Sequence, residues 1–427
     1  MRKRIVVIPL LFIIGLGIFI FVSRAVSAVD RKQEDDLYRQ VEIFSDSLAI
    51  VRMDYVDDTD AKDLIYGALK GMLASLDPHS QFMDPETYNE LKVDTEGKFG
   101  GLGIEITLKD GLLTVVTPLE DTPAWKAGMK ANDRIVKIDD ELTRDLTLTD
   151  AVKKLRGKPG TSVSLSVLRE SENKILDFKI TRDMIKIKDI KEAKILENGI
   201  AYVRLSEFRE NTSKDLDKAL KNLSNSGMKA LILDLRNNPG GLLDVAVEVA
   251  GKFVDKGKKV VYTKGRQPAQ NMELLADDGS PILELPMAVL INEGSASGSE
   301  IVAGCLQDYK RAIIVGMKSF GKGSVQSVIP LSDGSALRLT TSKYFTPLGK
   351  IIHEKGVEPD ILVEEGRIEI TRNGKTEDQK EEIFSKIDGK NEPPQEDAAL
   401  GYKSDNQLMR AVDILKALEF YQSNGKT

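Results

Sequence analysis

Apolar and polar residues alternate with different periods along the chain, and each change of period marks a new region. From residue 30 to residue 94, apolar residues recur at steps of three and four, which is the period of an amphipathic helix. This pattern predicts a helical N-terminal region. The residues that carry it are Leu37, Val41, Phe44, Leu48 and Val51 in a first helix, and Leu64, Ala68, Leu69, Met72 and Leu76 in a second.

Residues 95–183 have a different pattern, in which short apolar alternations are separated by turn residues. Such a pattern predicts a small β-rich domain. The predicted strands cover residues 103–108, 112–118, 134–138, 162–168 and 176–181, and the predicted short helices cover residues 124–128 and 149–155.

Residues 184–366 alternate strand-like and helix-like stretches, which predicts an α/β fold in which helices flank a sheet. The predicted strands are 200–205, 230–235, 259–262, 287–291, 312–315 and 336–344, and the predicted helices are 213–224, 242–253 and 297–307. Residues 367–427 form a C-terminal region with a linker composition at 388–396 and a helical period at 406–421. The fold class predicted for the whole chain is therefore multi-domain α/β.

The N-terminus, residues 1–29, has the pattern of a targeting segment. Three basic residues precede an uncharged apolar run over residues 5–22, and Val26-Ser27-Ala28 follows. This run is long enough to be one transmembrane helix that acts as a signal anchor, while the small residues after it also fit a cleaved signal peptide. In both cases we expect the rest of the chain to be extracytoplasmic, at a cell surface or in a periplasm, or secreted if the segment is cleaved.

Composition excludes several classes of function. The 427 residues carry a net charge of −6 without a sustained basic stripe, which argues against nucleic-acid binding. One cysteine excludes an intramolecular disulfide, and one cysteine with two distant histidines argues against a metal site built on these residues. We expect no metal and no cofactor.

A serine and a lysine follow two of the predicted strands. Ser297 lies among small residues after strand 287–291, and Lys322 lies between glycines after strand 312–315. Neither histidine has the sequence context of a triad histidine, so a serine nucleophile here would need a different base. A lysine can serve when it is neutral, which requires its pKa to fall by roughly 3 units, or about 4 kcal/mol. A helix-capping serine and a solvated loop lysine are the alternative interpretations.

Two further segments could complete such a site. Gly240 and Gly241 follow strand 230–235 and could offer backbone N–H groups to an oxyanion, although a plain strand-to-helix turn has the same pattern. Gln326 lies four residues after Lys322, and in an extended segment the two side chains would share one face. Gln326 could then orient the Lys322 amine.

The β-rich domain contains a glycine-rich segment, Gly100–Ile104, which could bind a carboxylate and pair with an extended peptide, or could be only a structural turn. Residues 116–138 closely resemble the central stretch of bacterial PDZ domains. This resemblance implies that Leu102, Gly103 and Ile104 receive the C-terminal carboxylate of a peptide. It also implies that Ala151 and Leu155 line the pocket for the last side chain, and that the ligand is an apolar, uncharged tail.

Residues 37–362 resemble the C-terminal processing peptidases, serine proteases that carry an inserted PDZ domain. The matching motifs are 76–80, 100–104, 234–241, 292–300, 320–326 and 356–360. The resemblance implies a crotonase-like protease core, Ser297 as nucleophile, Lys322 as general base and Gln326 as its positioning residue. The oxyanion would be bound by the N–H of Gly298 and by one N–H from Gly240 or Gly241. Family members often have alanine where this chain has Gly298.

These observations predict a membrane-anchored, extracytoplasmic serine endopeptidase that binds the C-terminal tails of substrates and cleaves near them. Ligand binding to the PDZ domain is expected to regulate the site, and the family and the amphipathic ends of the chain predict a homodimer. The alternatives are a catalytically silent PDZ scaffold at the membrane, a PDZ protease with a histidine triad, and a crotonase-like peptide-binding protein.

Overall fold

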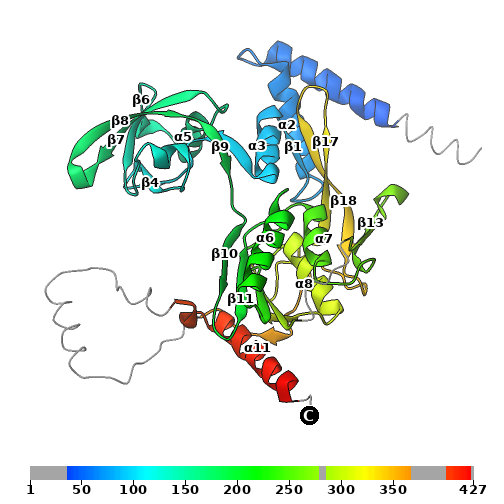
Figure 1. The fold of residues 1–427 in the computed structure, drawn as a ribbon. Coiled ribbons are helices and arrows are strands. Elements are labelled where there is room, and N and C mark those ends of the chain that lie inside the picture. Colours follow the sequence, from blue (N-terminus) through cyan, green and yellow to red (C-terminus); the bar gives the residue numbers. More distant parts are fainter. Residues whose placement is uncertain (1–35, 278–284, 367–400, 425–427) are drawn as a thin grey trace, which may run out of the picture. The chain divides into compact units, whose positions relative to one another are not determined.

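The computed structural model describes residues 36–277, 285–366 and 401–424 (Figure 1). The predicted membrane or signal segment and the predicted linker at 388–396 lie outside these residues. Within the described ranges, no helix is both long and apolar enough to cross a membrane. The chain divides into two compact units, Met1–Asp84 and Pro85–Thr427.

The first unit contains the two helices that the apolar period predicts. One covers residues 36–54, and the other is α2, Ala61–Ala74, which begins where the Asp60 carboxylate accepts a hydrogen bond from the Lys62 N–H at 2.7 Å. A turn held by Asp77 follows, and the short strand β1, Gln81–Met83, ends the unit.

The second unit begins with a helix that the sequence did not separate from its neighbours, α3, Pro85–Glu96. This helix has no buried residue, so its sequence carries only a weak apolar period. Next, β2, Lys98–Gly101, pairs antiparallel with β9, Asp183–Lys186. These two strands form the entry and the exit of the β-rich domain, residues 98–186.

The β-rich domain is built on one antiparallel sheet with the strand order β3-β4-β5-β7-β8, and β6 pairs with β5. Its core includes Val115, Ile135 and Val167, all fully buried. The predicted strands and helices are all present. The bounds are β3 Ile104–Lys109, β4 Leu112–Pro118, β5 Arg134–Ile138, β6 Glu141–Leu142, β7 Ser162–Arg169, β8 Lys174–Thr181, α4 Pro123–Lys126 and α5 Leu148–Leu155.

The α/β domain, residues 190–424, contains a sheet with the order β10-β11-β12-β15-β16-β19. β10 is antiparallel to β11, and the strands from β11 to β19 are parallel. The bounds are β10 Ile190–Ile195, β11 Ile200–Leu205, β12 Ala230–Asp234, β15 Met287–Ile291, β16 Ile313–Gly316 and β19 Ile361–Leu362.

Successive side chains of each strand point to opposite faces of the sheet, so the buried strands present apolar residues on both faces. Helices cover both of these faces. On one face, Val203, Leu233 and Val289 share a core with α6, Thr212–Asn225, α7, Leu243–Gly251, and α8, Gly298–Asp308, which lie beside one another in Figure 1. On the other face, Tyr202 and Ile232 share a core with α11, Asn406–Asn424.

A second sheet completes the α/β domain. In it β18, Ala336–Phe345, pairs with β13, Lys259–Gly265, and with β17, Ser324–Pro330, while β13 also pairs with β14, Glu273–Leu275. β17 follows the Lys322 segment directly, so this sheet supports one side of the predicted site.

Candidate active site

The predicted site residues lie at one edge of the parallel sheet. β12, β15 and β16 are neighbours and run in the same direction. The turn with Gly240 and Gly241 follows β12, Ser297 follows β15, and Lys322 follows β16. Because the carboxyl ends of parallel strands meet at one edge, segments far apart in sequence are brought together there, where α/β proteins usually bind ligands.

Ser297 has a strained backbone at the start of α8. Its φ is +51°, in the left-handed region that residues with a side chain rarely adopt. Gly240 lies directly against it: a Cβ on Gly240 would be 2.7 Å from Ser297 Cβ and 2.8 Å from Gly298 N. Only glycine fits at position 240, which brings the turn after β12 into contact with the serine and with the first N–H of α8.

The backbone N–H groups around Ser297 differ in their availability. The Gly240 N–H donates to Asn238 Oδ1 at 2.9 Å, so it is already used. Within the described residues, the N–H groups of Gly241 and Gly298 have no hydrogen-bond acceptor. Gly298 is the first residue of α8, where a helix leaves its N–H groups unpaired and positive potential accumulates. Gly241 and Gly298 are therefore the residues with donors free for an anion.

The Lys322 amine is held in a partly buried position. Burial lowers its pKa, the positive charge of Arg338 lowers it further, and the Glu300 carboxylate opposes both effects. In the part of the chain that the structure describes, Lys322 Nζ has no hydrogen-bond or ion-pair partner. A lysine in these surroundings loses its proton more easily than a solvated one.

Glu300 connects the serine segment to the lysine segment. The side chain is fully buried, and its carboxylate accepts hydrogen bonds from the Ser297 N–H at 2.8 Å and the Lys322 N–H at 2.9 Å. It also accepts from the Gly321 N–H at 2.7 Å and the Ser319 hydroxyl at 2.6 Å. Burial raises the pKa of Glu300, while these hydrogen bonds act in the opposite direction. Our sequence reasoning gave this residue no role, although an acidic residue three positions after a helix start is a known capping signal.

Tyr344 on β18 contacts the Lys322 segment from the other sheet. Only 1% of its surface is exposed. Its hydroxyl donates a hydrogen bond to the Lys322 carbonyl oxygen. Burial raises the pKa of Tyr344 well above its usual value, and the nearby Glu300 charge adds to the effect. Tyr344 was also missed from sequence.

The prediction for Gln326 assumed an extended segment from Lys322 to Gln326, which the structure does not contain. The Gln326 side-chain amide donates to Ser324 Oγ at 2.9 Å, and among the described residues no hydrogen bond joins it to Lys322. Two features explain the difference. β17 begins only at Ser324, after the lysine, and the pairing with β18 shifts register between Val325 and Gln326. The segment from 322 to 326 is thus not a continuous strand with regular alternation.

The glycine-rich segment of the β-rich domain forms a tight loop before β3. Gly103 has a φ of +75°, and a Cβ there would be 2.3 Å from Thr122 Cβ. Its carbonyl oxygen accepts hydrogen bonds from Leu119 N at 2.8 Å and Thr122 Oγ1 at 3.1 Å. Leu102 is buried, and Ile104 begins β3, which pairs only with β4 in the described sheet and so leaves one edge open. The loop and the open edge are both available to an extended peptide.

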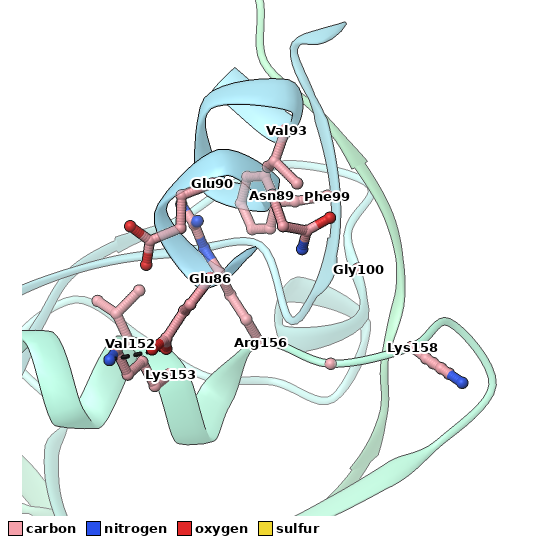
Figure 2. A pocket seen from close by; sticks show the side chains of 11 residues that line it. Glu86, Asn89, Glu90, Val93, Phe99, Gly100, Val152, Lys153, Arg156 and Lys158 are labelled. Atoms are coloured by element: carbon pink, nitrogen blue, oxygen red, sulfur yellow. Dashed lines mark ion pairs between the residues drawn. The ribbon is translucent and has the colours of Figure 1, made fainter. Parts of the chain in front are cut away.

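Ala151 and Leu155 face the interior of the β-rich domain. They are 0% and 5% exposed, and they share a core with Leu102. The neighbouring residues of α5, Val152 and Arg156, instead line a cavity of about 440 Å³ beside Gly100 (Figure 2).

This cavity lies between α3, β2 and α5, as Figure 2 shows. A 2.7 Å ion pair between Glu86 on α3 and Lys153 on α5 crosses one side of it. The Arg156 guanidinium lies over the Phe99 ring, 4.4 Å from the ring centre. Glu86, Lys153 and Arg156 at the cavity therefore already have partners, and these contacts attach α3 to the β-rich domain.

Comparison with known proteins gives consistent matches along the chain. Residues 199–363 match Peptidase family S41, residues 114–169 match the PDZ domain, and residues 22–87 match the activating protease CtpB N-terminal domain. The chain is 43% identical over 411 residues to the carboxy-terminal-processing protease of Bartonella bacilliformis, which covers 94% of this chain and 94% of that protein.

Two further relatives have a lower sequence identity to this chain. A probable CtpA-like serine protease of Staphylococcus aureus is 33% identical over 425 residues, covering 96% of this chain and 82% of that protein. Among solved structures, the photosystem II D1 C-terminal processing protease is 33% identical, with 74% of this chain and 86% of that chain covered and a TM-score of 0.44. The chain belongs to peptidase family S41, and it is a serine-type peptidase of the carboxy-terminal-processing group with a PDZ domain.

Proposed function

We propose that this protein is an extracytoplasmic endopeptidase that cuts protein substrates near their C-termini with a Ser297–Lys322 dyad. The observation that carries the proposal is the shared anchoring of the two residues. One buried carboxylate, that of Glu300, binds the backbone N–H groups of both Ser297 and Lys322. The Lys322 amine is at the same time partly buried, with a lowered pKa.

In the proposed reaction, Ser297 Oγ attacks the scissile carbonyl carbon while the neutral Lys322 amine takes the serine proton. The N–H groups of Gly298 and Gly241 bind the oxyanion, and Gly240 leaves the space for it beside the serine. Lys322 then gives its proton to the leaving amine, and water, deprotonated by Lys322, releases the acyl group from Ser297. In the substrate-bound enzyme, the Gln326 side chain would give up its hydrogen bond to Ser324 and would orient the Lys322 amine instead.

The PDZ domain would present the substrate. The open edge of β3 can add an extended peptide as a further strand, and the loop at Leu102, Gly103 and Ile104 can bind a terminal carboxylate through backbone N–H groups. Ala151 and Leu155 would shape the side-chain pocket from within the core. An apolar, uncharged tail is the expected ligand. Tail binding would also regulate cleavage, and equal cleavage rates of a short peptide with and without a PDZ ligand would contradict this regulation.

The remaining parts of the proposal concern location and assembly. The basic start and the apolar run of residues 5–22 support a membrane anchor or a cleaved signal.

The exposed apolar side chains of Leu37, Val41 and Phe44 on the helix over residues 36–54 support a homodimer, because a second copy could cover them. The βα units of the parallel sheet support a crotonase-like core. Protease protection in intact cells and light scattering of the purified protein would test location and assembly.

The test of the central proposal uses the full-length protein and an unstructured substrate protein that ends in an apolar tail. Intact mass of the substrate is followed with the parent, Ser297→Ala, Lys322→Ala and Gln326→Ala. We expect the parent to cut near the tail, the first two variants to lose at least about 1,000-fold in rate, and Gln326→Ala to be slower but active.

Lys318→Ala is the matched control. Lys318 is an exposed lysine four residues before Lys322 and pairs with Glu358 at 2.7 Å, so its loss changes the charge equally but leaves the site intact. Equal cleavage by the parent and Lys322→Ala would refute the dyad. Tail binding without cleavage by the parent would instead favour the PDZ scaffold.

A further inference from the structure

Tyr344 is a buried tyrosine whose hydroxyl contacts the segment that carries Lys322. The Lys322 carbonyl oxygen accepts its hydrogen bond. Tyr344 reaches this place from β18, an element that contributes none of the residues predicted from sequence.

A phenol hydroxyl has one proton to donate and lone pairs with which to accept. Here the proton is committed to the Lys322 carbonyl oxygen. Because the side chain is 1% exposed, water cannot easily replace this interaction.

We propose that Tyr344 is a positioning residue of the dyad: its hydroxyl fixes the main chain at Lys322, and with it the place of the amine relative to Ser297. This inference rests on the proposed function of the two residues. Glu300 binds the N–H of Lys322 and Tyr344 binds its carbonyl oxygen, so the peptide groups on both sides of the lysine are fixed by buried side chains. Displacement of a reacting group by about 1 Å can cost 100-fold in rate.

The experiment compares the full-length parent with Tyr344→Phe, which keeps the ring and removes only the hydroxyl. Tyr309→Phe is the matched control, since the Tyr309 hydroxyl also donates to a lysine carbonyl oxygen, that of Lys259, at 2.9 Å. Tyr309 follows the C-terminal end of α8, about 18 Å along the helix from Ser297. Each protein is assayed for kcat and KM on one peptide over a range of pH, and for its melting temperature.

For Tyr344→Phe we expect kcat to fall by about 10- to 100-fold, KM to stay within about twofold, and the acid limb of kcat/KM to move to higher pH. The limb should move because a loosened lysine segment is better solvated, which favours the charged amine. The titratable groups that face Lys322 are Glu300 on α8 and Arg338 and Tyr344 on β18, and the first two are unchanged in this variant. Tyr309→Phe should match the parent.

The possible outcomes separate this inference from the proposed function. Parent-like kcat and an unshifted pH profile in folded Tyr344→Phe would overturn the inference while leaving the dyad intact. A loss of activity with an unmoved profile and raised KM would show a merely structural hydroxyl and would also overturn it. An inactive parent would refute the proposed function instead. If Tyr344→Phe does not fold, 3-fluorotyrosine at position 344 replaces it, and the changed strength of its hydrogen bond to the Lys322 carbonyl oxygen should change kcat; an unchanged kcat would overturn the inference.

Discussion

In the proposed dyad, Lys322 must lose a proton before it can accept one from Ser297, and its surroundings make that loss easier. Burial disfavours the charged amine, and Arg338 repels it, while Glu300 favours it. Because the Glu300 carboxylate is also bound by backbone N–H groups and a serine hydroxyl, part of its charge is already neutralised by other donors. In the proposed mechanism, the balance of these effects on the pKa of Lys322 sets the pH at which the enzyme is active.

Replacement of Arg338 by glutamine should move the acid limb of activity to higher pH. The positive charge of Arg338 lowers the pKa of Lys322, so its removal raises that pKa and leaves less neutral amine near neutral pH. We expect lower kcat/KM below the limb and parent-like values above it, measured as a pH profile on one peptide. Arg204 is an exposed residue of β11. Its replacement, Arg204→Gln, changes the net charge equally and should leave the pH profile unmoved. A limb that stays in place in Arg338→Gln would contradict this account of the Lys322 environment.

Sequence reasoning identified some residues of the site and missed others for a physical reason. Ser297 and Lys322 stand in short motifs after predicted strands, so local pattern is enough to select them. Glu300 and Tyr344 act through contacts that exist only after two sheets and a helix have assembled. Gln326 was placed by strand alternation, which fails where a strand starts late and shifts register.

At the scale of elements, tight turns determine where the ligand-binding groups lie. Gly103 and Gly111 have the same φ of +75°, but only Gly103 is crowded: a Cβ there would be 2.3 Å from Thr122 Cβ, whereas nothing lies within 4 Å at Gly111. The two positions therefore separate the effect of backbone strain from the effect of a close contact.

Gly103→Ala should weaken binding of an apolar C-terminal peptide by at least about tenfold, because the added methyl group pushes Thr122 and the loop apart. Gly111→Ala carries the same backbone strain in open space and should bind like the parent. Peptide affinity measured by calorimetry, with melting temperature as a folding check, distinguishes the two. Equal affinity of both variants would argue against this loop as the carboxylate site.

Strongly patterned elements could be predicted from sequence, and weakly patterned ones could not. Strands at Arg134–Ile138, Ile200–Leu205 and Met287–Ile291 have the predicted bounds, because apolar runs between turn residues mark both ends. β10 was missed: it is an antiparallel outer strand in which half of the residues are polar and none is buried. α3 was missed because no face of it is buried.

At the scale of the whole molecule, the C-terminal helix is part of the α/β domain. The sequence suggested that its apolar stripe could meet a second copy of the chain, but Leu408, Val412 and Leu415 are buried against the sheet. An ion pair at 2.7 Å also joins Arg236, which follows β12, to Asp405, which precedes α11. α11 therefore supports the strand that leads to the oxyanion turn, and its apolar stripe is not free for a dimer.

The most direct test of the dyad is to trap the nucleophile with a fluorophosphonate on the full-length protein and to map the adduct by mass spectrometry. The account predicts an adduct on Ser297 that is absent in Ser297→Ala, at least about 100-fold slower in Lys322→Ala and unchanged in Lys318→Ala. An adduct on a different serine, or labelling of Lys322→Ala at the rate of the parent, would contradict it.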